Sequence, residues 1–267
     1  MSFPGWAHLA RVALLALSAV GLLATPVKAD GERRILAPTG SLRVGVYPGS
    51  PTSMVTDAGG APHGLSYDLG GELAKQLGVP VDYVRFQRVA DIVAAIRDGQ
   101  IDFTVTNATP ARGNDVSFSQ PVLSIELGYL IPANSAISRV DEIDRPGVRI
   151  GVTKGSTSER TLPAKFGNAT IVPAENVKVA VAMFAGGEID LYATNKPTLF
   201  EMSDQMTGAR ILDGNWGLEH MAVAIPKGRE TALPLLNRFV QDVRSSGALQ
   251  AMERQAGLRG AVDPPRE

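Results

Sequence analysis

The hydrophobic positions in the first half of the chain alternate between the two-residue period of a strand and the period of a helix. Leu42 to Tyr47, Val79 to Phe86 and Ile101 to Val105 are short β-rich segments, which predicts three strands. Between them, Tyr67 to Leu77 and Val89 to Arg97 each place apolar side chains on one helical face. A glycine just past each face is typical of a helix end. This order predicts an α/β lobe with parallel strands, in which ligands bind beyond the carboxyl ends of the strands.

The second half repeats the pattern. The order helix, Gly, x, Ile-Asp, strand occurs at Ile101-Asp102 and again at Ile189-Asp190. Two apolar segments with proline near their ends, Leu127 to Pro132 and His220 to Lys227, predict extended connectors that cross between two lobes. The sequence therefore predicts two lobes of similar topology. The strands and the helix expected in the second lobe cover residues 148–152, 170–172, 177–184 (helix) and 189–193.

The N-terminus carries the parts of a secretory signal peptide. Arg11 precedes an uncharged apolar run from Val12 to Ala24, and the small-x-small pattern Val27-Lys28-Ala29 follows. This apolar run is shorter than the roughly 20 residues that a bilayer-spanning helix needs. We therefore expect a signal peptide over residues 1–29, cleavage after Ala29 and export to the periplasm. An uncleaved membrane anchor is the alternative.

Composition excludes several classes of partner and cofactor. Removal of residues 1–29 takes away Arg11 and Lys28 and no acid, which reduces the 26 basic residues to 24 against 27 acidic ones, a net charge of −3. Without a basic block, this charge argues against nucleic acid as a partner. The chain has no cysteine, so disulfides, a cysteine-linked lipid anchor and Cys-ligated metal sites are excluded. Its three histidines show no metal-type spacing, and we expect no metal and no cofactor.

Five short motifs occur in order between Leu42 and Leu258. They are Gly64-Leu65-Ser66-Tyr67-Asp68-Leu69, Asp98-Gly99-Gln100-Ile101-Asp102-Phe103, Thr109-Pro110-Ala111-Arg112 with Val116-Ser117-Phe118-Ser119-Gln120-Pro121, Gly151-Val152-Thr153-Lys154-Gly155-Ser156-Thr157-Ser158-Glu159, and Gly187-Glu188-Ile189-Asp190. Each is weak alone. Together, their order and spacing resemble the family 3 extracellular solute-binding proteins, which serve the uptake of polar amino acids and related solutes.

The resemblance implies the type II periplasmic binding protein fold, with two α/β lobes joined by a two-strand hinge and the ligand cleft between them. Residues 30–131 and 224–267 would form lobe 1, and residues 132–223 would form lobe 2. It also implies the periplasmic component of an ABC importer, which closes its lobes on a small solute and delivers it to a permease in the inner membrane. We expect a monomer, because one chain supplies both lobes.

Arg112 is the first candidate ligand-binding residue. It follows the third predicted strand and matches the arginine that grips the ligand carboxylate in the family. A planar guanidinium offers two parallel donors to the two oxygens of a carboxylate. Thr106, Asn107 and Thr109 lie between the strand and Arg112, where their polar groups would complete the carboxylate shell. The alternatives are a surface arginine and ordinary turn residues.

Lys154 to Ser158 is the corresponding segment of the second lobe. A glycine-containing turn that enters a helix N-terminus presents N–H groups and the positive end of the helix dipole to an anion. We expect Ser156 and Thr157 to contact the ligand. Capping of this helix by Thr157 or Ser158 is the simpler alternative.

Two positions depart from the family members that bind standard α-amino acids. Those proteins carry an aspartate for the ammonium group where this chain has Asn195, and an amide cannot neutralise a cation. They also place aromatic residues after the first strand, where this chain has Gly49 to Ser53. Tyr67 is expected to compensate in part for the missing aromatic residues. We therefore predict a small anionic or zwitterionic, carboxylate-bearing ligand, either amino acid-like or an organic acid.

Two other functions remain open. The periplasmic cyclohexadienyl dehydratases use the same fold for a decarboxylative dehydration that needs a positioned proton donor. The candidate acids near the expected cleft are Glu126, Glu201, Glu219 and His220. No motif links any of them to proton transfer, so we interpret them as solvated surface or connector residues and predict no enzyme. The second alternative is the ligand-sensing domain of a receptor or wall-cleaving enzyme, which would act with a separate partner protein.

Overall fold

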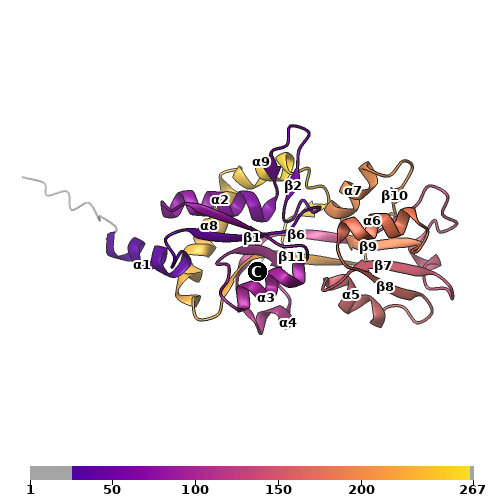
Figure 1. Cartoon of the computed structure of the whole chain (residues 1–267), viewed down its shortest axis with the longest axis horizontal. Coiled ribbons are helices and arrows are strands. Elements are labelled where there is room, and N and C mark those ends of the chain that lie inside the picture. Colours follow the sequence, from indigo (N-terminus) through magenta and orange to yellow (C-terminus); the bar gives the residue numbers. More distant parts are fainter. Residues whose placement is uncertain (1–25, 265–267) are drawn as a thin grey trace, which may run out of the picture.

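Two α/β lobes lie end to end and are joined by two long strands (Figure 1). The structure is a computed structural model and describes residues 26–264. Nearly all of the predicted signal peptide, residues 1–25, lies outside the described residues, and its last four residues begin helix α1 (Pro26–Leu36). None of the helices in the described part of the chain combines the length and the apolar character that crossing a bilayer requires.

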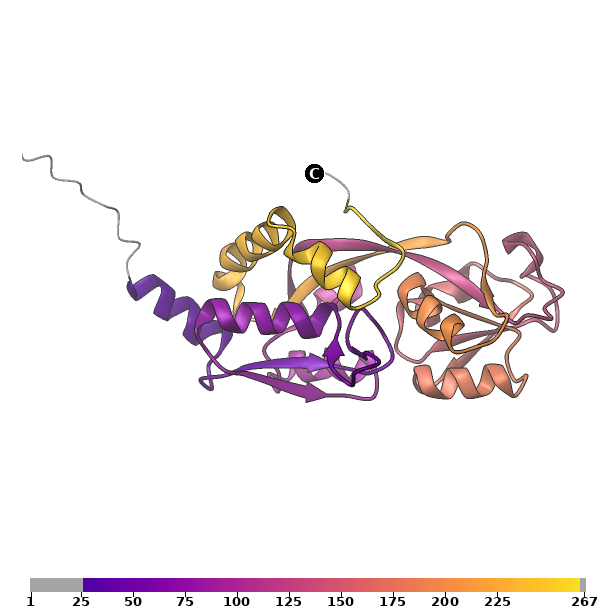
Figure 2. The same ribbon diagram turned by 90° about the horizontal axis from the view of Figure 1, so that it is seen from above.

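Lobe 1 is built on the parallel pair β1 (Leu42–Val46) and β4 (Val81–Arg85), with Phe103 bridged to Val44 at the entrance to β5 (Thr104–Asn107). The predicted strand–helix–strand–helix–strand order is thereby confirmed. The C-terminal helices return to this lobe, shown in yellow beside α2 in Figure 2. Its other elements are β2 (Val55–Thr56), β3 (Pro62–His63), α2 (Leu65–Leu77), α3 (Val89–Arg97), α4 (Pro110–Gly113), α8 (Leu233–Ser245), α9 (Ala248–Gln255) and β12 (Ala261–Val262).

Lobe 2 repeats this plan on the parallel strands β8 (Thr170–Ala174), β7 (Arg149–Thr153) and β9 (Leu191–Asn195). One apolar cluster packs on each face of this sheet, around Ile150 and around Tyr192. Its helices and remaining strand are α5 (Thr157–Thr161), α6 (Val177–Ala185), α7 (Lys196–Asp204) and β10 (Arg210–Ile211). Short 3-10 turns cover Val140–Glu142, Leu162–Ala164 and Glu230–Ala232.

The two connectors are the antiparallel strands β6 (Val116–Ile131) and β11 (Gly217–Pro226). In lobe 1, β11 pairs with β5, and in lobe 2, β6 pairs with β9, so one sheet in the order β5-β11-β6-β9-β7-β8 runs through both lobes. The predicted fold class, two lobes joined by a two-strand hinge, is confirmed. The lobe boundaries after residues 131 and 223 stay a prediction, since both strands extend through the two lobes.

The repeated Ile-Asp motif has the same packing in each lobe. A Cβ added to Gly45 of β1 would lie 2.3 Å from Cδ1 of Ile101, and a Cβ added to Gly151 of β7 would lie 2.4 Å from Cδ1 of Ile189. Real Cβ atoms do not approach another carbon this closely, so a larger residue at either glycine would displace the buried isoleucine from the first strand of its lobe. The resemblance between the two halves therefore extends from sequence to packing.

The aspartate of each motif binds an arginine of the same first strand. Asp102 accepts hydrogen bonds from Nε and Nη2 of Arg43 at 2.8 and 2.7 Å, and Asp190 accepts from the same two atoms of Arg149 at 3.1 and 2.8 Å. The two pairs differ in burial. Asp102 is fully buried and also accepts from Arg229 at 2.7 Å, whereas the Asp190 side chain is 35% exposed.

Candidate functional site

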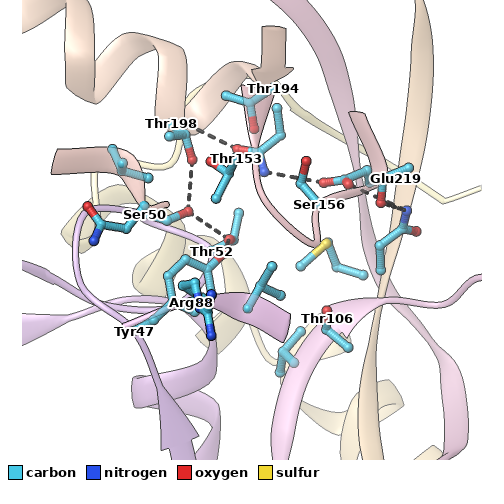
Figure 3. A pocket seen from close by; sticks show the side chains of 18 of the residues that line it. Tyr47, Ser50, Thr52, Arg88, Thr106, Thr153, Ser156, Thr194, Thr198 and Glu219 are labelled. Atoms are coloured by element: carbon cyan, nitrogen blue, oxygen red, sulfur yellow. Dashed lines mark hydrogen bonds between the residues drawn. The ribbon is translucent and has the colours of Figure 1, made fainter. Parts of the chain in front are cut away.

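A cavity of about 50 Å³ lies between the two lobes (Figure 3). Its walls come from the carboxyl ends of β1, β5, β7 and β9, as parallel sheets predict, and from the hinge strand β11. Residues of both lobes form these walls, so a solute bound in the cavity would contact both lobes. The lining residues are Tyr47, Ser50, Thr52, Gln87, Arg88, Val89, Val105, Thr106, Asn107, Arg112, Thr153, Ser156, Thr157, Asn176, Val177, Thr194, Asn195, Thr198, Glu219 and Met221.

Most of the residues predicted to bind the ligand line this cavity. They are Thr106, Asn107, Arg112, Ser156, Thr157 and Asn195. Thr109 and Tyr67 do not. Thr109 instead caps helix α4, where its hydroxyl accepts a hydrogen bond from the Arg112 backbone N–H at 3.2 Å. The Tyr67 ring stacks on Tyr83 of β4 with a centroid distance of 3.8 Å. Neither side chain reaches the cavity wall in this conformation, because each has a structural partner of its own, and their contact with a ligand stays a prediction.

Arg112 is almost completely buried, with 6% of its surface exposed. Its Nη1 donates to Oγ1 of Thr106 at 2.7 Å and to the backbone oxygen of Asn107 at 3.2 Å, which fixes the guanidinium against the end of β5. Every fully buried side-chain nitrogen in residues 31–264 has a hydrogen-bond partner, so the remaining guanidinium N–H groups of Arg112 reach open space. Burial lowers the pKa of Arg112, and the neighbouring Glu219 carboxylate acts in the opposite direction. The group stays a cation.

Glu219 on β11 also lines the cavity, and only 8% of its surface is exposed. The interpretation of Glu219 as a solvated residue is therefore wrong, although its place on a connector is confirmed. Its Oε2 accepts from Nδ2 of Asn195 at 3.2 Å, and its Oε1 accepts from Nδ2 of Asn107 at 3.5 Å. Figure 3 shows the Glu219 side chain beside the segment that carries Ser156.

Both asparagines are themselves held by backbone groups. Asn195 caps helix α7, because its Oδ1 accepts from the Thr198 N–H at 3.1 Å. Asn107 accepts from the His220 N–H at 3.0 Å. Their amide groups are thereby oriented with the N–H side toward Glu219. Asn195 thus donates a hydrogen bond to Glu219 inside the cleft, whereas the resemblance to the family predicted that it contacts the ligand.

In the second-lobe turn, the residue that caps the helix differs from the two that the capping alternative named. Ser156, rather than Thr157 or Ser158, is the N-cap of helix α5, and its hydroxyl accepts from the Glu159 N–H at 3.2 Å. The Glu159 carboxylate accepts from the Gly155 N–H at 2.6 Å, so this part of the turn already has an anionic partner. The Thr157 hydroxyl faces lobe 1 and accepts from Nδ2 of Asn107 at 3.1 Å.

A hydroxyl cluster closes the opposite side of the cavity. Ser50 Oγ lies 2.9 Å from Thr52 Oγ1 and 2.8 Å from Thr198 Oγ1, and the second contact joins lobe 1 to lobe 2 (Figure 3). Tyr47, just after β1, adds an aromatic ring to the wall, which the sequence comparison did not anticipate. Burial raises the pKa of the Tyr47 hydroxyl, while hydrogen bonding to Thr52 opposes this shift.

The other candidate acids lie outside the cavity wall. Glu126 forms an ion pair with Lys196 at 2.5 Å, and the His220 ring contacts the Ser124 hydroxyl at 2.8 Å. Glu201 lines a separate, mainly apolar groove beside α6. The side chains of residues 31–264 include no cluster of three or more groups suited to hold a metal ion.

Comparison with known proteins agrees with this geometry. Among curated proteins, the chain is 24% identical over 197 residues to the ABC transporter glutamine-binding protein GlnH of Bacillus subtilis (strain 168), covering 70% of each chain. It is 23% identical over 198 residues to a probable histidine-binding protein of Neisseria gonorrhoeae, covering 72% of this chain and 73% of that protein. Both relatives are named as binding proteins and not as enzymes.

Solved structures share the fold. The ancestral amino acid-binding protein AncCDT-1, a precursor of cyclohexadienyl dehydratase, superposes with a TM-score of 0.73 and 25% identity, covering 85% of this chain and 98% of that one. The solute receptor for L-cysteine of Neisseria gonorrhoeae gives a TM-score of 0.75 and 23% identity, covering 87% and 94%. The model of the bacterial extracellular solute-binding proteins, family 3, matches residues 42–257. With this match and its two-lobed cleft, the chain belongs to the bacterial extracellular solute-binding proteins, family 3.

Proposed function

We propose that this protein is the periplasmic solute-binding component of an ABC importer and that it captures a small carboxylate-bearing solute between its lobes. The observation that carries the proposal is Arg112, a buried cation whose unused N–H groups face the cavity between the lobes. A buried guanidinium gains most from a bidentate contact with a carboxylate. The Thr106 hydroxyl and the Asn107 carbonyl hold it in place for that contact.

Capture requires the lobes to move about β6 and β11. The contacts that join the lobes around the cavity in this conformation include the Ser50–Thr198 hydroxyl pair and the Asn107–Thr157 hydrogen bond. A solute that touches both walls favours the closed state by as much as it binds that state better than the open one. A permease in the inner membrane would then distinguish the loaded protein from the empty one. The relatives support this role, since they are named as components that bind amino acids.

A thermal-shift screen tests the proposal. The purified protein is melted with each of the 20 standard amino acids, with organic acids, with amines and with small oxyanions. A ligand at 100 times its Kd stabilises the folded state by about 2.7 kcal/mol. For a chain of this size that corresponds to a rise of about 5–10 °C in Tm.

The matched variants are Arg112→Ala and Arg97→Ala. Arg97 is exposed and pairs with Asp98, far from the cavity wall. We expect saturable stabilisation by one class of carboxylate, lost in Arg112→Ala and kept in Arg97→Ala. The proposal is contradicted if amines alone stabilise the protein, if Arg112→Ala responds like the wild type, or if a compound such as prephenate is consumed rather than bound.

A further inference from the structure

Two opposite charges are buried in the same cavity without pairing with each other. Arg112 is 6% exposed and Glu219 is 8% exposed, and both line the space between the lobes. Neither side chain belongs to any ion pair closer than 4.0 Å among the described residues. The cavity therefore has a positive pole at Arg112 and a negative pole at Glu219.

A buried charge is costly unless an opposite charge or several hydrogen bonds compensate it. An ionised carboxylate has about four acceptor sites on its two oxygens. Glu219 uses two of them, on the amides of Asn195 at 3.2 Å and Asn107 at 3.5 Å. These amides are neutral, and the second distance is at the long limit of a hydrogen bond. They orient the carboxylate, which forms no direct ion pair among the described residues, while the Arg112 charge acts on it through space.

The two amides come from different lobes. Asn107 ends β5 of lobe 1, and Asn195 ends β9 of lobe 2, whereas Glu219 lies on the hinge strand β11 between them. The carboxylate is thus assembled where both lobes and the hinge meet. A cation bound there would be held at the point about which the lobes close.

We propose that Glu219 receives the ammonium group of the solute while Arg112 receives its carboxylate, so that the solute class is a zwitterionic amino acid. This inference rests on the proposed function, because it adds a second pole to the same cavity. In this arrangement Asn195 does not contact the ammonium group as a charge partner. Asn195 instead positions Glu219, which contacts the ammonium group.

The alternative is that the two poles balance each other through space and that the solute carries no cation. Matched pairs of ligands separate the two cases. The probes are L-glutamine, L-arginine, L-histidine and L-cysteine, each paired with the carboxylic acid that lacks only its α-amino group. For glutamine this partner is 4-carbamoylbutanoic acid, and for cysteine it is 3-sulfanylpropanoic acid. The partner acids are smaller than the amino acids, so a loss of affinity cannot come from a steric clash.

Titration calorimetry measures each pair on the wild type, on Glu219→Gln and on the control Glu72→Gln. Glu72 is exposed on α2 and pairs with Lys75. We expect the wild type and the control to bind at least one amino acid tenfold or more tightly than its partner acid. Glu219→Gln should weaken that amino acid at least tenfold and should change the affinity for the partner acid by less than about threefold.

The outcomes distinguish this inference from the proposed function. If Glu219→Gln binds the amino acid as tightly as the wild type, or if the wild type prefers the partner acids, Glu219 does not bind an ammonium group. The proposed capture of a carboxylate-bearing solute would still stand in that case. If neither class binds and Arg112→Ala behaves like the wild type, the proposed function itself fails. The comparison within the wild type needs no variant, so it decides whether the ammonium group of the solute is recognised even if Glu219→Gln does not fold, and a preference for the partner acids overturns the inference by itself.

Discussion

Ser50→Ala should shift the balance between the open and closed lobes. Ser50 Oγ lies 2.8 Å from Thr198 Oγ1 across the cleft, and the two residues are 1% and 3% exposed. Another contact between the lobes, the ion pair of Arg88 with Glu175 at 2.9 Å, lies at the surface with side chains 32% and 55% exposed. The buried pair and the exposed pair therefore allow a matched comparison.

The magnitude follows from the surroundings of each pair. A neutral hydrogen bond contributes about 1 kcal/mol net, which corresponds to a factor of about five in the ratio of closed to open molecules. In Ser50→Ala, the Thr198 hydroxyl also stays buried without this partner in the closed state, whereas water hydrates it in the open state. A change of about fivefold in the ratio of closed to open molecules is therefore the smallest that we expect. An exposed ion pair contributes only about 0.2–1 kcal/mol and is screened by salt. Glu175→Gln should therefore have a smaller effect, which fades as salt is added.

Single-molecule energy transfer measures this ratio directly. The chain has no cysteine, so two introduced cysteines are the only labelling sites. Lys75→Cys on α2 and Ala182→Cys on α6 place one dye on each lobe at exposed positions. The reasoning is refuted if Ser50→Ala leaves the closed fraction unchanged, or if Glu175→Gln has the larger effect at high salt.

Two further predictions concern the repeated motif. Gly45→Ala and Gly151→Ala should each destabilise the protein by about 1–3 kcal/mol, because the added Cβ would lie 2.3 or 2.4 Å from an isoleucine carbon. Urea unfolding measures this loss, and wild-type stability of both variants would contradict the packing argument. Asp102→Asn should cost about 3–5 kcal/mol, because Asp102 is fully buried between two arginines, whereas Asp190→Asn should cost less than about 1 kcal/mol. The Arg149 guanidinium lowers the pKa of Asp190 in the folded protein. The ionised Asp190 therefore stabilises the fold above the ordinary carboxyl pKa, and this stabilisation is lost as the pH falls through the lowered pKa of the folded state. The stability difference between the wild type and Asp190→Asn should therefore shrink below about pH 4, and a difference that grows in acid would contradict the assignment.

The fold followed from local patterns because each lobe is built from short, strongly periodic segments. The Ile-Asp repeat was the most informative signal, since it marks the same strand in each lobe and binds an arginine of the first strand in both. The connectors were recognised only in part. Their N-terminal portions carry polar side chains, and β6 begins at Val116, well before the apolar segment that predicted it.

The cavity was predicted less completely than the fold. Arg112 and its neighbours follow from their place at the end of a strand, and the same rule applied to β1 would have included Tyr47. Thr109 precedes a proline at the first turn of α4, which is a capping signal. Tyr67 lies two residues from Leu65 and Leu69, on the opposite face of α2. There it packs against the edge of the lobe core and stacks on Tyr83 instead of facing the cavity.

Glu219 could not be assigned from composition or spacing. Alternate residues of a strand face opposite sides, so Glu219 and Met221 share the cavity face of β11 while the His220 ring contacts Ser124. Burial of that face depends on the pairing of β11 with β5 and β6 and on lobe 2 lying across it. These are long-range contacts, and no local pattern around Glu219 specifies them.

The most direct test of the account is the affinity of Arg112→Ala, measured by titration calorimetry with the ligand that the thermal screen identifies. Removal of one partner of a buried charge pair costs about 2–5 kcal/mol, which corresponds to a loss of roughly 30-fold to several thousand-fold in affinity. Arg97→Ala, at an exposed position, should bind like the wild type. If Arg112→Ala keeps the affinity of the wild type, the solute carboxylate is not held by Arg112 and the central claim is wrong.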